Sequence, residues 1–293
     1  MAAESVDQAT SSLNWGAEFW AHVKHRTPLA FRHSLNEHPT LDRESIAQLA
    51  ESLGEESVTC ETAVKPLVYT DGAPEPGRAQ RAAELVRMID ENESWLTLLN
   101  IEQHPRYRAL IDEQLDGAAR RYGVDPSELR RRMGFIFVSS PHGVTGAHFD
   151  IEHSLQLQLR GNRTVNFGEW PDQATRDREI SRYWNGSYGK LTSMPTPVAE
   201  FAVGPGVGMY IPPYTPHWLL NGDETSLSLT ITFFTRDNES ESLVQAFNER
   251  LRKLGLHPRR EGESALRDGA KSGFMRAYSA GRRRLHPARP TPR

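Results

Sequence analysis

A histidine and an aspartate two positions apart, His148 and Asp150, are the residues of this chain best placed for chemistry. Residues i and i+2 of a β-strand point to the same side of a sheet, so these two side chains can reach one metal ion together. A second histidine, His217, follows in the stretch YIPPYTPHW, where we expect another strand. Two imidazoles and one carboxylate on one face of an iron ion leave adjacent coordination positions open. The pattern therefore predicts a metal site formed by His148, Asp150 and His217.

The predicted ligands also have a purely structural interpretation. A histidine and an aspartate at this spacing are common by chance, and a histidine in PPYTPHW could simply cap a turn. Two other histidines lie close in sequence, His142 and His153, and we leave both out of the metal shell. His153 has the opposite strand parity to the ligands.

The totals are those of an ordinary soluble globular protein. A chain of 293 residues is long enough for one large domain or two modest ones. Its formal net charge of -3 gives no indication of a nucleic-acid or membrane partner. No stretch is long and apolar enough to cross a bilayer, and the N-terminus lacks the apolar core of a secretion signal. Cys60 is the only cysteine, which excludes an internal disulfide and favours a cytoplasmic location.

The pattern of apolar residues divides the chain into three parts. Residues 1–94 are predicted to form a mainly helical region that packs on the part that follows. Residues 95–236 contain short β-rich runs between turn residues, with one early helix around Tyr107 to Leu115. Such runs without regular alternation with helices favour a β-sandwich or barrel over a parallel sheet. Residues 237–293 are predicted to form C-terminal helices and a basic tail.

Two of the β-rich runs alternate strictly between apolar and polar residues. Their polar faces consist of Ser154, Gln156 and Gln158 in the first run, and of Ser226, Ser228, Thr230 and Thr232 in the second. A polar face of an antiparallel sheet usually faces water. Here the metal ligands His148 and Asp150 share the parity of the first polar face, so we interpret these faces as the lined interior of a barrel mouth.

Three segments together resemble a known family. GVTGAHFDIEHSLQLQLRGNRTVNFGEW, PGVGMYIPPYTPHWLLN and SLSLTITFF are similar to the JmjC (cupin-like) Fe(II)- and 2-oxoglutarate-dependent oxygenases, above all to the protein-hydroxylase branch typified by factor inhibiting HIF. The resemblance covers roughly residues 95–234. It implies a mainly β fold, a double-stranded β-helix (jelly roll) with N- and C-terminal helices. It also implies Fe(II), the cosubstrate 2-oxoglutarate and O2.

The resemblance assigns roles to two residues near the predicted ligands. Thr145 matches a threonine whose hydroxyl meets the distal carboxylate of 2-oxoglutarate, and Arg163 falls where the family places a lysine for the same carboxylate. An arginine offers a planar fork that fits a carboxylate, so the change is chemically sensible. Alternatively, Arg163 is an ordinary charge at a hairpin turn and Thr145 a plain loop hydroxyl.

Further positions near the cosubstrate and metal are matched less closely. Ser154 and Thr232 stand where the close relative has asparagines. In the run SWLTLLNIEQ, Trp95 or Thr97 occupies the region of a tyrosine that contacts the cosubstrate in that relative. Between the two ligand-bearing halves lie aromatic residues that either pack internally or face the substrate: Trp170, Tyr183, Trp184 and Tyr188.

The family implies hydroxylation of a C–H bond in a protein, peptide or amino-acid-like substrate, with release of succinate and CO2. One alternative is an oxygenase or N-demethylase that acts on a free small molecule in a biosynthetic pathway. Another is a non-catalytic cupin-like binding module, against which the complete ligand set argues. An open groove across the barrel mouth would favour a peptide, and a closed cavity a small molecule.

The C-terminal helices are predicted to form a homodimer. Their apolar row, which needs a partner surface, consists of Leu243, Val244, Phe247, Leu251 and Leu254. A second helix over SALRDGAKSGFMRAYSAG would cross the first. Alternatively, the row packs on the barrel and N-terminal helices of the same chain. The basic end RRRLHPARPTPR is either a solvated terminus or a surface for an acidic partner.

Overall fold

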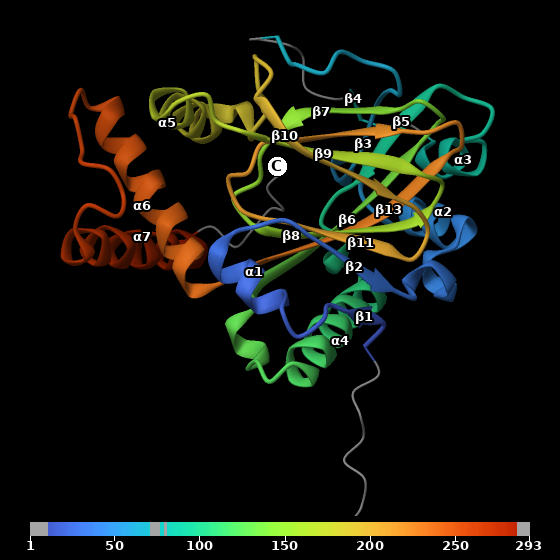
Figure 1. Ribbon diagram of the computed structural model, residues 1–293, viewed down its shortest axis with the longest axis horizontal. Coiled ribbons are helices and arrows are strands. Elements are labelled where there is room, and N and C mark those ends of the chain that lie inside the picture. Colours follow the sequence, from blue (N-terminus) through green and yellow to red (C-terminus); the bar gives the residue numbers. More distant parts are fainter. Residues whose placement is uncertain (1–10, 71–76, 79–80, 286–293) are drawn as a thin grey trace, which may run out of the picture.

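Two antiparallel β-sheets face each other in the computed structural model, which describes residues 11–70, 77–78 and 81–285 (Figure 1). The larger sheet has the order β1-β2-β11-β8-β13-β6-β5-β3-β4, and the smaller has the order β10-β9-β12-β7. The strands of the larger sheet are β1 (Leu13–Asn14), β2 (Leu29–His33), β3 (Val58–Thr62), β4 (Gly77–Arg78), β5 (Ser94–Leu98), β6 (Arg130–Ser139), β8 (His153–Arg160), β11 (Val207–Ile211) and β13 (Ser226–Phe234). Those of the smaller sheet are β7 (Val144–His148), β9 (Arg163–Glu169), β10 (Thr196–Val203) and β12 (His217–Asn221).

Helices surround the two sheets. They are α1 (Phe19–His25), α2 (Arg43–Ser52), α3 (Ala82–Arg87), α4 (Pro105–Arg121), α5 (Gln173–Arg182), α6 (Arg236–Lys253) and α7 (Ala265–Leu285). From β7 to β13 the chain passes repeatedly between the sheets, as a jelly roll requires. The predicted fold class, mainly β with flanking helices, is confirmed. None of the helices in the described ranges is long and apolar enough to span a membrane.

The region before residue 95 differs from the mainly helical region that we predicted. It contains α1, α2 and α3, but β2 pairs with β11 and β3 pairs with β5, so both strands extend the larger sheet. The physical reason is that a central sheet leaves unpaired N–H and C=O groups at its edges, and short strands from elsewhere satisfy them. The pairing is therefore determined by the edge of the sheet. The sequences of the short strands themselves indicate β structure only weakly.

The main hydrophobic core lies on one face of the larger sheet. Leu155, Leu157 and Leu229 point into it and are completely buried, as the alternation of β8 and β13 predicts. Burial of such a side chain contributes about 1.5–3 kcal/mol. The helix α4 covers this core with Leu110 and Leu115. The opposite, polar face of the same strands is thereby directed toward the smaller sheet.

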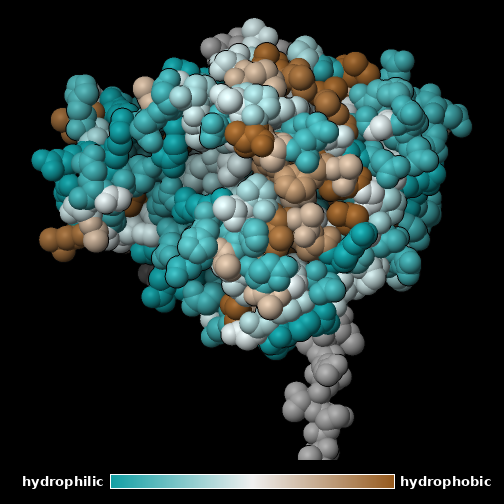
Figure 2. Space-filling model, viewed as in Figure 1, coloured by the Kyte–Doolittle hydropathy of each residue, from teal (hydrophilic) through white to brown (hydrophobic). Residues whose placement is uncertain are grey.

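The C-terminal helices α6 and α7 pack against each other at one side of the sheets (Figure 1). Thr235 and Asn238 form a capping box at the start of α6. In the space-filling view this part of the surface is mostly hydrophilic, with isolated apolar side chains at its outer edge (Figure 2). Residues 286–293, which include most of the predicted basic tail, lie outside the described residues.

Two histidines buried in the fold predict a loss of stability in acid. Burial lowers the pKa of His33 to about 4 and that of His153 to about 3, below the ordinary value of 6.5. Between pH 6.5 and the lowered pKa of each histidine, the unfolded chain binds a proton that the folded protein excludes. The free energy of unfolding therefore falls as the pH falls through this range. Each histidine contributes about 1.4 kcal/mol per pH unit. Urea denaturation from pH 7 to pH 5 should show the free energy of unfolding falling with pH. His33→Gln should remove the contribution of His33 and make this slope shallower. Equal slopes in the variant and the wild type would contradict the expectation.

Candidate metal centre and cavity

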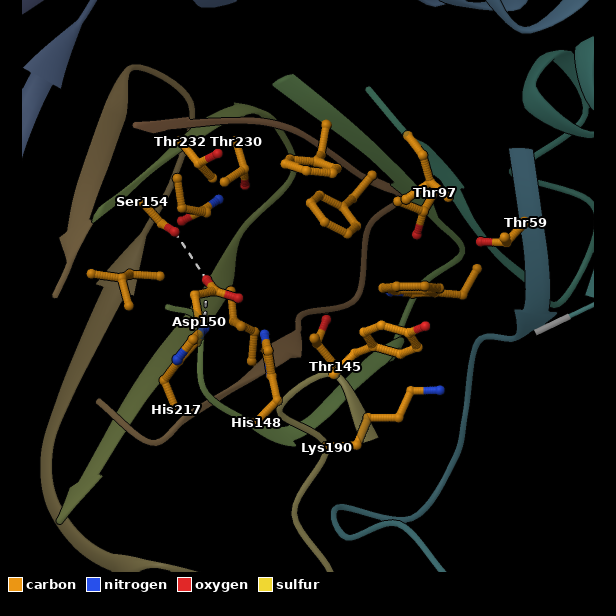
Figure 3. A pocket seen from close by; sticks show the side chains of 18 of the residues that line it. Thr59, Thr97, Thr145, His148, Asp150, Ser154, Lys190, His217, Thr230 and Thr232 are labelled. Atoms are coloured by element: carbon orange, nitrogen blue, oxygen red, sulfur yellow. Dashed lines mark hydrogen bonds and ion pairs between the residues drawn. The ribbon is translucent and has the colours of Figure 1, made fainter. Parts of the chain in front are cut away.

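The three predicted ligands meet at one end of the cavity between the sheets. One ligand atom from each of His148, Asp150 and His217 lies within 4.8 Å of the other two (Figure 3). His148 ends β7 and His217 begins β12, and the two residues are paired in register, with ring centroids 4.1 Å apart. Asp150 differs from the prediction in one respect, because it lies just beyond the end of β7 and not on the strand. Its backbone carbonyl accepts a hydrogen bond from the Tyr214 amide, which holds the chain there.

Backbone carbonyl groups orient both imidazole rings. His148 Nδ1 donates to the Gly146 carbonyl at 2.8 Å, and His217 Nδ1 donates to the Thr215 carbonyl at 3.0 Å. With the proton held on Nδ1, the Nε2 lone pair of each ring is available as a metal ligand. Burial and the neighbouring His148 lower the pKa of His217 to about 4, so this ring is neutral at ordinary pH.

A serine from the opposite sheet fixes the carboxylate. Ser154 Oγ donates to Asp150 Oδ2 at 2.9 Å, and this serine on β8 is completely buried. The structure thus brings Ser154 to the metal centre as predicted, but its contact is with the ligand Asp150. Thr232 pairs with Ser154 in register, and its buried hydroxyl has no hydrogen-bond partner among the described residues.

A bulge in β7 places a further predicted residue in the cavity. His217 and Leu219 on β12 lie opposite His148 and Thr145 on β7. An advance of two residues along β12 is thus matched by an advance of three residues along β7. In a regular strand, residues three apart point to opposite faces. The extra residue reverses the parity, and both Thr145 and His148 line the cavity (Figure 3).

Arg163 lies on the cavity wall, where β9 begins. It is 5% exposed, and its guanidinium donates to Asn221 Oδ1 from Nε and Nη2 and to Ser228 Oγ from Nη1. Among the described residues no carboxylate contacts it. Burial without such a partner lowers the pKa of Arg163 to about 10. The neighbouring Arg160 is exposed and does not line the cavity.

The polar strand faces line the cavity at the end nearer the metal ligands, whereas Gln158, Ser226 and Ser228 are not among its lining residues. The cavity has a volume of about 560 Å³. Ser154 and Gln156 of β8 and Thr230 and Thr232 of β13 are among its lining residues. The predicted aromatic cluster divides, because Tyr183 and Tyr188 line the cavity while Trp170 packs on Phe149 and donates to the Tyr214 carbonyl.

Several lining residues were not predicted as part of the site. They include Thr59, Glu61, Lys65, Tyr69, Phe135, Phe137 and Lys190. Phe135 and Phe137 could have been found from the alternation in GFIFVSS, which gives them one common face. Lys65 and Lys190 come from irregular segments and had no sequence signal. Of the two candidates on β5, Trp95 and Thr97, both line the cavity.

Comparison with known proteins agrees with this geometry. Residues 128–241 match the JmjC domain model, so this part of the chain carries a JmjC domain. A structure titled as E. coli ycfD has a TM-score of 0.51 and 16% identity, covering 93% of this chain and 69% of the other. A second, titled as a ribosomal oxygenase from Escherichia coli, has a TM-score of 0.51 and 17% identity, covering 92% and 67%. At this identity the likeness supports the fold alone, and no curated protein sequence gives a match.

Removal of the Ser154 hydroxyl should weaken metal binding. Ser154→Ala frees the Asp150 carboxylate to rotate, and loss of such a partner lowers metal affinity by about 10- to 100-fold. Titration of the metal-free protein with Co(II), followed by calorimetry, measures the effect. Ser226→Ala is a matched control, since Ser226 lies on the same polar face and bonds to Gln158. Equal affinities in the Ser154 variant and the wild type would contradict this role.

Proposed function

We propose that this protein is an Fe(II)- and 2-oxoglutarate-dependent dioxygenase that hydroxylates a C–H bond of a protein, peptide or amino-acid-like substrate. The observation that carries the proposal is the combination of His148, Asp150 and His217 with a buried arginine, Arg163, in one cavity. The first three can hold a metal ion, and the fourth lacks an anionic partner among the described residues.

The donor set fits iron(II). Two neutral imidazoles and one carboxylate on one side of an ion are the ligands of non-haem Fe(II) oxygenases, and they leave positions for a cosubstrate and dioxygen. A structural zinc site would instead be closed by a fourth protein ligand. Among the described residues no further histidine, cysteine or carboxylate joins the group.

Arg163 fits the distal carboxylate of 2-oxoglutarate. Its guanidinium uses Nε, Nη1 and Nη2 for bonds to Asn221 and Ser228, yet a guanidinium carries five N–H donors. A buried cation is unfavourable without a counter-charge. A carboxylate bound beside Arg163 supplies this counter-charge. The Thr145 hydroxyl on β7 can donate a further hydrogen bond to the same carboxylate.

The protein's own residues account for positioning. His148 and His217 are held by backbone carbonyls, and Ser154 holds Asp150, so the ligands are set before any metal arrives. When bound, iron with 2-oxoglutarate and dioxygen supplies the oxidation that places a hydroxyl on carbon and releases succinate and CO2. The hydrophobic neighbours Ile211 and Leu219 help to exclude water from the ligands.

The shape of the cavity supports a peptide over a free metabolite. Its lining includes exposed residues at one side, Gly186 and Tyr188, so the cavity reaches the surface. Its volume of about 560 Å³ exceeds what a small dicarboxylate requires. One of the structurally similar proteins is a ribosomal oxygenase, which also favours a protein substrate. A small-molecule oxygenase or N-demethylase is the alternative, and mass spectrometry of the product separates them: a gain of one oxygen atom supports hydroxylation, and loss of a methyl group supports demethylation.

The central test is release of succinate from 2-oxoglutarate with Fe(II), O2 and panels of candidate peptides. Asp150→Ala should abolish turnover, because two histidines alone do not hold the metal in place. Circular dichroism and thermal unfolding should show that the variant stays folded. Full activity in this variant would rule out the metal assignment.

Loss of Arg163 should weaken binding of the cosubstrate. A charge-assisted hydrogen bond is worth about 1.5–3 kcal/mol, so Arg163→Ala should raise the KM for 2-oxoglutarate by about one to two orders of magnitude. Arg160→Ala is the matched control, since this neighbouring arginine is exposed. An unchanged KM in the Arg163 variant would show that another group holds the carboxylate.

We also expect a homodimer through α6 and α7. Val244 is buried within the chain, but Leu254 is 75% exposed, and Leu266 and Phe274 of α7 are 86% and 57% exposed. Phe274 contacts Phe247 of α6, so an apolar contact near the exposed face links the two helices. Light scattering at micromolar concentration should give a dimer for the wild type.

Phe274→Glu should shift this dimer to a monomer, since it places a charge in the contact. Met88→Glu serves as the control, because Met88 is 52% exposed and lies outside α6 and α7. A monomeric mass for the unmodified chain would contradict the dimer.

A further inference from the structure

The aspartate of the metal centre lies outside both sheets. β7 ends at His148 and β8 begins at His153, so residues 149–152, which we call the ligand segment, belong to no strand. The two histidine ligands differ in this respect, because His148 and His217 are paired with each other in register. A ligand outside a strand ladder needs other contacts to fix it, since a metal site tolerates only small departures from its geometry. The position of Asp150 therefore depends on contacts from other parts of the chain.

The ligand segment is anchored on both sides of Asp150. Its neighbours in the chain, Phe149 and Ile151, are buried in one hydrophobic cluster, while the Asp150 side chain points the other way, into the cavity (Figure 3). Two backbone hydrogen bonds hold the first half of the segment. The Phe149 amide donates to the Gly189 carbonyl at 3.1 Å, and the Asp150 carbonyl accepts from the Tyr214 amide at 2.6 Å. The second half is held by a side chain.

This side chain comes from the C-terminal helices. Asn238, in the first turn of α6, donates from Nδ2 to the Ile151 carbonyl at 2.9 Å. Asn238 is 1% exposed and does not line the cavity, so it acts on the metal centre only through the ligand segment. Because Ile151 follows Asp150 directly, a shift of the Ile151 carbonyl moves the backbone that carries the carboxylate. We refer to this hydrogen bond as the tether.

Both ends of the Asn238 amide are in use, and only one of them serves the helix. Oδ1 accepts from the Thr235 amide at 2.7 Å and from the Thr235 hydroxyl at 3.0 Å, which completes the capping box of α6. The orientation of the side chain follows, since the Thr235 amide can only donate and the Ile151 carbonyl can only accept. A carboxylate would accept the capping bonds equally well and is favoured at a helix N-terminus. An amide is therefore required at position 238 only for the tether.

We propose that Asn238 is a positioning residue of the metal centre, which holds Asp150 in place through the Ile151 carbonyl. The inference rests on the metal ligands of the proposed function, and it makes the start of α6 part of the support of that centre. The Ser154 hydroxyl orients the carboxylate itself. Asn238 fixes the backbone from which this carboxylate extends, so the two residues support opposite ends of the same ligand.

Asn238→Asp separates the tether from the cap. The variant keeps the acceptor that caps α6, loses the donor and places a carboxylate against the Ile151 carbonyl. We expect the Kd for Co(II), measured by calorimetry on the metal-free full chain, to rise about tenfold, as for other residues that support metal ligands. The added negative charge by itself attracts the cation, so a rise in Kd does not come from charge. The visible absorption of the Co(II) protein should change as well, because its bands report the geometry of the ligands.

Asn248→Asp is the matched control. Asn248 lies on the same helix, is completely buried and also donates from Nδ2 to a backbone carbonyl, that of Arg259 at 3.1 Å, in the linker between α6 and α7. It follows Asn238 by ten residues, which is about 15 Å along a helix. The control variant loses an equivalent hydrogen bond away from the ligand segment. It should lower the free energy of unfolding in urea and leave the Kd and the spectrum of Co(II) unchanged.

A second pair of variants serves if Asn238→Asp does not fold. Thr235→Ala removes a hydroxyl of the cap alone, and Asn238→Ala removes cap and tether together, so only the latter should raise the Kd for Co(II). Wild-type affinity and spectrum in the Asn238 variants, or an equal loss of affinity in Asn248→Asp, would overturn the positioning role, even where the wild type releases succinate. If the Asn238 variants bind Co(II) more weakly as expected but the wild type releases no succinate from 2-oxoglutarate, the proposed function fails and the positioning role stands.

Discussion

The pairing of β7 with β12 is the constraint on which the rest of the site depends. It places His148 directly opposite His217, so that two imidazoles from positions far apart in the sequence lie 4.1 Å from each other. Backbone hydrogen bonds of a ladder are numerous and act together, which makes this placement insensitive to single side-chain changes. The larger sheet then supplies the complementary groups, with Ser154 bonded to Asp150 across the cavity. The metal centre is thus a product of two sheets held face to face.

A polar interior is unusual in a β-sandwich. Here one face of the larger sheet packs in the hydrophobic core and the other face lines the polar cavity. Leu155 and Leu157 of β8 point to the main core, while Ser154 and Gln156 of the same strand point to the cavity. The apolar face stabilises the sheet, because burial of several such side chains contributes many kcal/mol in sum. The polar face, including the buried Arg163, contributes chemistry and opposes stability. Function and folding therefore use the same strands without competing for the same residues.

Sequence patterns predict the parts of this protein that follow a period. The alternation of β8 and β13 identifies the core face and the cavity face, and the spacing of His148 and Asp150, with His217, identifies the metal centre. The resemblance adds Thr145, Arg163, Ser154 and Thr232 as residues of the same cavity, and the structure brings all four there.

The remaining wall could not be read from the sequence, since tertiary hydrogen bonds position it. Leu67 and Leu191 bond through their backbones to Ala147 on β7, and these contacts bring Lys65, Tyr69 and Lys190 to the cavity. Such segments lack a repeating pattern, so their own sequence does not reveal which strand they will lie beside. The outer strands β2 and β3 escaped prediction for the same reason, because each pairs with a strand that is not its neighbour in the sequence pattern we recognised, β2 with β11 and β3 with β5.

The bulge in β7 makes chain length a determinant of chemistry. The extra residue lies between Thr145 and His148. Before it, the odd-numbered position Thr145 faces the cavity, and after it the even-numbered position His148 does. Gly146 within the bulge is also tightly enclosed, since a Cβ there would lie 2.8 Å from the Tyr69 ring. Evolution can therefore separate the metal ligands from the hydroxyl at Thr145 by deleting a single residue, with no substitution at either position. Among relatives of this domain, the count of residues across this short stretch carries information that residue identity alone does not.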